Sequence, residues 1–248
     1  MKLLTLADGF GDSGAYPLWY SGYYKWPELI QLMTIGVELL NLSRYGAGNE
    51  YIVECLKNNI IEKDYVIIQW ARPNRLDLLL AHNEYKNFWS DAVSQDSTYS
   101  KNVVNDYWIT SASKNLAVQE YHKKYISLEQ HCRRSRLYID YARLLLISNN
   151  VNFNFMLTAD SEYLADRATD HHWLWHHPWA GMDSFRTLSR YTDLDFGYRQ
   201  PIPLIQFDYI QKYIIPNTNL PWRSSQELKA VESMLHRKYK ESIINKPI

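Results

Sequence analysis

The first 80 residues repeat one pattern: a short apolar run, a polar or glycine-containing turn, and a segment with helical periodicity. The apolar runs lie at residues 3–7, 37–42 and 65–70, and a fourth follows at residues 151–157. The run at residues 65–70 is continuous, which is typical of a strand buried on both faces of a parallel sheet. Strands that alternate with helices predict an α/β protein with a doubly wound parallel sheet between two helical layers.

Helical periodicity and end signals divide the rest of the chain. Pro27 suits the first turn of a helix, and Ser224 and Glu227 have the spacing of a capping box. Apolar residues at intervals of three and four predict one long helix over residues 116–148. The other predicted helices cover residues 26–36, 50–59, 203–215 and, at the C-terminus, about 226–243. We expect one domain over residues 1–248, with a partly helical insertion at about 82–115 and an irregular one at about 160–190.

Composition limits which binding partners and which cellular compartment we expect. Lys and Arg together number 27, as do Asp and Glu, so no basic field favours nucleic acid. No apolar run approaches the roughly 18 residues of a membrane span, and the N-terminus does not resemble a signal peptide. We therefore expect a chain made in the cytoplasm, with Cys55 and Cys132 reduced and no cofactor or metal. The 20 tyrosines and 9 tryptophans are numerous, and such rings favour interfaces and sugar-binding surfaces as well as cores.

Three polar turns follow the first three predicted strands. The first holds Ser13 among Gly9, Gly11 and Gly14, the second covers residues 41–49, and the third covers residues 71–75. The carboxyl ends of parallel strands share one edge of a sheet, so these turns are expected to converge. A serine on a glycine-rich turn is a candidate nucleophile if a base lies nearby, and otherwise belongs to an ordinary capped βα turn.

These turns resemble the sequence blocks of the SGNH/GDSL hydrolase superfamily. The similarity lies in Gly11-Asp12-Ser13, in Asn41 to Gly46, and in an asparagine-bearing turn with Asn74. The resemblance implies a three-layer, flavodoxin-like fold and removal of acyl groups from esters, often on carbohydrates. It implies that Ser13, preceded by Asp12, matches the nucleophile, and that Gly46 (or Gly48) and Asn74 match oxyanion-binding positions, although Arg72 stands where the family usually has glycine.

A narrower resemblance is to SGNH-like proteins, some described as VrlC-like, that are encoded by tailed phages of cyanobacteria. It is strong over residues 1–80, thin over 82–190, and returns near 197–222. The segments that carry it are residues 7–13, 25–29 and 41–52. It implies a protein of the phage particle, with other phage structural proteins, and possibly a second copy, as partners.

The chain departs from the family at its last block, Asp-x-x-His before a C-terminal helix. The matching segment is residues 198–203, where Gln200 stands at the expected histidine and Asp195 lies nearby. An amide cannot take a proton from a serine hydroxyl at neutral pH. This predicts a fold that has lost its catalytic base.

A histidine- and tryptophan-rich segment at residues 171–179 follows the fourth strand. His172 or His176 could serve as a substitute base, or the two could bind a metal at i,i+4 spacing, or the segment could be an aromatic loop with no such role.

Two classes of function therefore remain from the sequence. The first, which we favour, is a catalytically inactive structural or assembly protein of a phage particle. The second is an active serine carboxylic-ester hydrolase acting on an acylated surface glycan, and non-catalytic glycan binding through the Tyr16–Tyr24 loop lies between the two.

Overall fold

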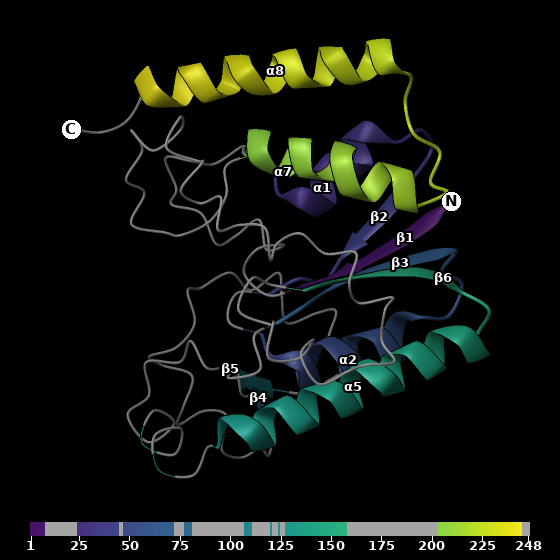
Figure 1. Ribbon diagram of the computed structural model, residues 1–248, viewed down its shortest axis with the longest axis vertical. Coiled ribbons are helices and arrows are strands. Elements are labelled where there is room, and N and C mark those ends of the chain that lie inside the picture. Colours follow the sequence, from purple (N-terminus) through teal and green to yellow (C-terminus); the bar gives the residue numbers. More distant parts are fainter. Residues whose placement is uncertain are drawn as a thin grey trace.

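The computed structural model describes residues 1–7, 24–44, 47–71, 77–80, 107–110, 127–157 and 203–244, together with residues 120 and 124. Four strands of these ranges form the main sheet: β1 (Lys2–Leu6), β2 (Glu38–Asn41), β3 (Tyr65–Trp70) and β6 (Asn152–Leu157). They are all parallel and lie in the order β2-β1-β3-β6 (Figure 1). The predicted α/β class and its parallel sheet are confirmed.

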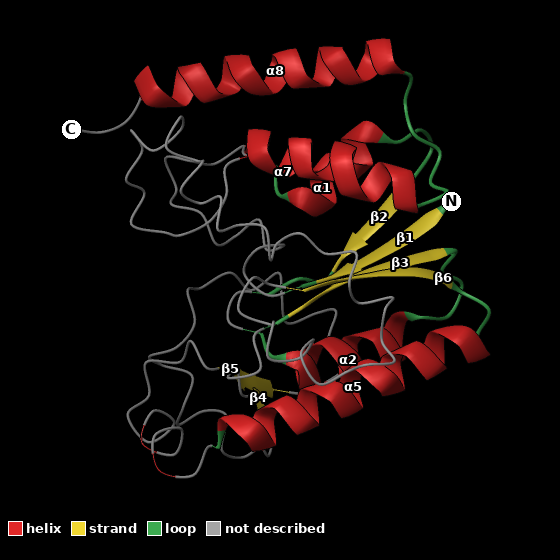
Figure 2. Cartoon of the chain, in the orientation of Figure 1, coloured by secondary structure: helices red, strands yellow, loops and turns green. Residues whose placement is uncertain are grey.

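Helices cover both faces of this sheet. The helices α1 (Trp26–Met33), α7 (Pro203–Tyr209) and α8 (Ser225–Ile244) lie on one side, and α2 (Asn49–Asn59) and α5 (Leu128–Ser148) lie on the other (Figure 2). Each side has its own hydrophobic core, and alternate residues of a strand contribute to each. On β3, for example, Ile67 points into the α1 side and Ile68 into the α2 side. The continuous apolar run at residues 65–70 is explained by this burial on both faces.

Several element bounds follow directly from local chemistry. Pro27 lies in the first turn of α1, and the turn after this helix contains Gly36 with a φ of +65°, a conformation that glycine adopts without strain. At the start of α8, Ser224 N donates to Glu227 Oε2 at 2.8 Å and Glu227 N donates to Ser224 Oγ at 3.4 Å, so the predicted capping box is confirmed. The predicted helix at 203–215 is α7 continued by a π-helical turn at Ile210–Ile214.

The helix α5 differs from its prediction in where it begins. It begins at Leu128, with Ser127 in extended conformation as its N-cap, rather than at residue 116. Its buried side chains include Ile139, Ala142 and Leu146, and α5 packs beside α2. Small residues such as Ala142 let the helix approach its neighbours closely, while Leu137 and Leu144, which contribute to the apolar periodicity of the sequence, point to solvent.

A two-stranded antiparallel ribbon, β4 (Asp77–Leu80) and β5 (Tyr107–Thr110), lies apart from the main sheet. Neither strand is predicted from the sequence, and β5 falls in the insertion at about 82–115 that was expected to be partly helical. The aromatic and β-branched residues of Tyr107–Thr110 favour a strand and were the available signal.

We predict that two leucines of α5 differ sharply in their contribution to stability. Leu146 is fully buried, so Leu146→Ala should lower the free energy of unfolding by about 2–4 kcal/mol through lost burial and the cavity left behind. Leu144→Ala makes the same chemical change on the exposed face and should cost less than about 0.5 kcal/mol. Urea unfolding followed by circular dichroism measures both, and equal losses would contradict the observed orientation of α5.

Candidate functional site

The candidate site lies where β1 and β3 end, at the carboxyl edge of the sheet. The chain passes from β1 to β2 on one side and then returns across β1 to form β3 on the other. The two crossover helices, α1 and α2, accordingly cover opposite faces (Figure 2). Such a switch in direction opens a crevice beyond the strand ends, which is the usual ligand position in open α/β sheets.

Backbone hydrogen bonds join the first two turns at their bases. Leu42 N donates to Thr5 O and Arg44 N donates to Ala7 O, both at 3.0 Å. The pairing of β1 with β2 therefore continues past the end of β2. The turn that carries Ser13 departs directly after Ala7, and Gly46 follows two residues after Arg44.

One side chain joins the second turn to the third. Asn49, the first residue of α2, accepts a hydrogen bond from Ala71 N at 2.8 Å and donates to Ala71 O at 3.2 Å. Its amide also donates to Ser135 Oγ of α5 at 2.9 Å. Asn49 thus satisfies both backbone groups of Ala71, the residue that directly follows β3 and lies three positions before Asn74.

The residues predicted from the sequence to form the site lie outside the described ranges. They are Asp12, Ser13, Gly46, Asn74, His172, His176, Asp195 and Gln200. What the structure brings together is the set of residues that flank the three turns. Gln200 precedes the start of α7 by three positions, and α7 packs against α1 on one face of the sheet.

A polar network that the sequence did not reveal lies beside the ends of β1 and β2. Asn41 Oδ1 accepts hydrogen bonds from Thr5 Oγ1 at 3.2 Å and from Ser43 N at 3.1 Å, while Asn41 Nδ2 donates to Glu28 Oε1 at 3.0 Å. The other carboxylate oxygen of Glu28 accepts from Lys25 N at 3.0 Å. The sequence marks Glu28 as a helix-start residue and Asn41 as the end of a strand, but no spacing rule pairs residues 13 positions apart across a sheet edge.

Burial raises the pKa of the Glu28 carboxyl above its ordinary value, while the hydrogen bond from Asn41 acts in the opposite direction. The carboxyl lies at the first turn of α1, where the helix dipole favours negative charge. Its two oxygens are both occupied as acceptors. Glu28 therefore holds the base of α1 against the strand ends rather than presenting a free oxygen.

The end of β3 carries two buried polar side chains with unused hydrogen-bonding capacity. Gln69 Oε1 accepts from Trp26 Nε1 at 2.7 Å, but Gln69 Nε2 has no acceptor among the described residues. On the opposite face, Trp70 Nε1 likewise finds no acceptor in the described part of the chain, and its ring packs edge-on against Phe155. Buried donors of this kind are costly, and they occur here next to the switch point.

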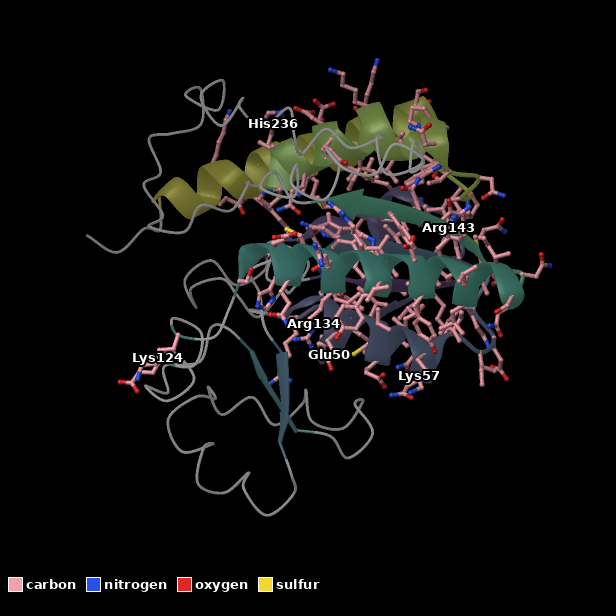
Figure 3. All side chains as sticks on the ribbon, turned by 60° about the horizontal axis from the view of Figure 1, so that its bottom comes forward. Glu50, Lys57, Lys124, Arg134, Arg143 and His236 are labelled. Atoms are coloured by element: carbon pink, nitrogen blue, oxygen red, sulfur yellow. The ribbon has the colours of Figure 1, made fainter. Side chains whose placement is uncertain are left out.

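Two histidines fall in the described ranges, and they occupy very different environments. His236 is exposed on α8, on the outside of the molecule, with Nε2 4.0 Å from Glu232 Oε1 (Figure 3). His131 is buried in the first turns of α5, one helical turn before Ser135, which accepts a hydrogen bond from Asn49 at the start of α2. The buried imidazole of His131 therefore lies on the side of α5 that faces α2.

Among the described residues, the polar side chains at this sheet edge are mainly amides that form hydrogen bonds within the fold. Within these ranges, no cluster of three His, Cys, Asp or Glu side chains is arranged to hold a metal ion. None of the helices described here is both long and apolar enough to cross a membrane. Comparison with known proteins found no family model that matches the chain and no curated protein that matches it.

We predict that Asn49→Ala destabilises the protein far more than a similar change at the other end of α2. The substitution leaves both backbone groups of the buried Ala71 without partners, which should cost about 2–4 kcal/mol. Asn59 is a suitable control because its amide makes a local bond to Cys55 O at 2.8 Å, and Asn59→Ala should cost about 1 kcal/mol or less. Chemical unfolding of the two variants beside the wild type gives the comparison, and a loss at Asn49 no larger than at Asn59 would show that the amide does not tie the turns together.

A second prediction concerns the pH dependence of stability that Glu28 causes. Because its pKa is raised in the folded state, Glu28 favours folding most at low pH. That contribution declines as the pH rises from about 4.5 through the folded-state pKa, and then becomes constant. The free energy of unfolding of the wild type minus that of Glu28→Gln should therefore fall over this interval. A difference that is flat or rises with pH would contradict the assigned environment.

Proposed function

We propose that this chain is a structural or assembly protein of a tailed-phage particle, built on a flavodoxin-like, SGNH-like fold that lacks its catalytic base. The observation that carries the proposal is that the residues flanking the three predicted turns are hydrogen-bonded to one another at one sheet edge. Arg44 bonds to Ala7 and Asn49 bonds to Ala71, so the segments that resemble the first three SGNH blocks depart from adjacent positions. The strand order β2-β1-β3-β6 supports the same fold because flavodoxin-like sheets begin in this order.

The absence of a base comes from the resemblance in the last block. Gln200 occupies the expected histidine position, and no histidine occurs in the sequence between His177 and His236. His236 itself lies exposed on the outer helix α8 (Figure 3). Loss of a base removes several orders of magnitude of rate from a serine hydrolase, whereas the sheet and its helices do not need an imidazole to fold.

A role in assembly requires surfaces that bind other chains. The 20 tyrosines and 9 tryptophans supply residue types that are enriched at such surfaces. The helix α5 also exposes large apolar side chains on its outer face. We expect the partners to be other proteins of the particle.

An active serine esterase is the second candidate, because Ser13 is retained at the position that resembles the nucleophile and a substitute base could come from His172 or His176. The buried His131 of α5 is a further imidazole to test, and it lies one helical turn from Ser135, which bonds to Asn49 at the start of α2. A base from α5 would replace the missing one of the last block without any change in the sheet.

Hydrolysis of a short-chain aryl ester separates the two functions. We predict that purified wild type and Ser13→Ala are equally inert, and that mass spectrometry finds the protein in purified phage particles. Circular dichroism confirms that the variant is folded. Hydrolysis by the wild type that Ser13→Ala abolishes would overturn the proposal, and its additional loss in His131→Gln would assign the base to α5.

A further inference from the structure

The outer face of α5 carries a stripe of exposed apolar side chains. Leu137 is 68% exposed, Tyr141 45%, Leu144 64% and Ile147 54%. The opposite face of the same helix is buried against α2 and the sheet. Single exposed apolar residues are ordinary, but four at spacings of four, three and three form a continuous strip along one side of a helix. Such strips on soluble proteins mark interaction surfaces.

We propose that this α5 stripe, defined by Leu137, Tyr141, Leu144 and Ile147, binds the same stripe of a second copy of the chain. The spacing is close to symmetric about residue 142. Antiparallel packing about a two-fold axis at that point sets Leu137 against Ile147 of the second copy, and Tyr141 against Leu144 of the second copy. A two-fold contact requires one surface to complement itself, and this order of side chains does so.

The charged residues beside the stripe also match between two copies that pack in this antiparallel register. Asp140 and Arg143 both lie on one flank of the stripe, three residues apart. Antiparallel packing about residue 142 sets Asp140 of one copy beside Arg143 of the other, and the symmetric pair forms at the same time. On the other flank, the partly buried Tyr138 and Leu145 are brought together in the same way. A partner of different sequence would not require this correspondence within a single helix.

The proposal does not depend on the residues of the three turns. It stands whether or not Ser13 is catalytic, and an ester assay leaves it untouched. Because one helix on each side makes a small interface, we expect a reversible dimer of micromolar or weaker affinity.

Sedimentation velocity of the full chain over roughly 5–500 μM tests the contact. We expect a concentration-dependent shift from monomer to dimer. Leu144→Asp should weaken the dimer at least about tenfold, because it introduces a charge into the apolar contact. Ile35→Asp is the matched control, since Ile35 is 52% exposed in the turn after α1 on the other side of the sheet, and it should leave the equilibrium unchanged.

Charge reversal tests the register and identifies the partner as a second copy. Asp140→Arg and Arg143→Asp should each weaken self-association, because each places like charges together twice. An equimolar mixture of the two variants should dimerise again, since one copy then offers two arginines and the other two aspartates. Pairing within one chain cannot produce that recovery. A wild type that stays monomeric throughout, a dimer unaffected by Leu144→Asp, or a mixture that fails to recover would overturn the proposal.

Discussion

The side chain of Asn49 is the contact on which the arrangement of the carboxyl edge depends. A parallel sheet ends in backbone groups that no further strand can satisfy, and in this protein the first residue beyond β3, Ala71, is fully buried. The Asn49 amide takes the place of a strand there by accepting from Ala71 N and donating to Ala71 O. Its third bond, to Ser135 Oγ, extends the contact to α5. One residue thereby fixes the start of α2, the end of β3 and one face of α5 relative to each other.

A second asparagine connects several elements in the same way on the opposite face of the sheet. Asn41 joins β1 through Thr5, its own turn through Ser43, and α1 through Glu28. Burial at this position raises the pKa of the Glu28 carboxyl, because it disfavours the charged form. The two asparagines therefore hold the strand ends from both faces. An ion pair between Arg134 and Glu50 at 2.9 Å adds a contact between α5 and α2 near the Asn49 side (Figure 3).

The sequence predicted those parts of the fold that depend on local patterns. The strand at residues 65–70 was predicted with its observed bounds because burial on both faces leaves a continuous apolar run. The start of α8 was predicted because a capping box is a local signal. The contacts of Asn41 and Asn49 could not be predicted, since each joins residues distant in sequence whose separation follows from the strand order. The orientation of α5 could not be predicted for a different reason. Leu137 and Leu144 contribute to the helical periodicity but are exposed, because periodicity alone does not tell which apolar residues face the core.

The fold depends on different chemical groups from those that catalysis would need. The hydrogen bonds described above at the strand ends use backbone groups, amides, hydroxyls and one carboxylate, and none of these bonds involves an imidazole. On the function that we propose, replacement of a catalytic histidine by Gln200 would leave these contacts intact. Selection would then act on the outer surfaces of the chain. The apolar face of α5 is such a surface, because the sheet and α2 are already packed against the opposite side of that helix. In the dimer that we propose, this face binds the second copy.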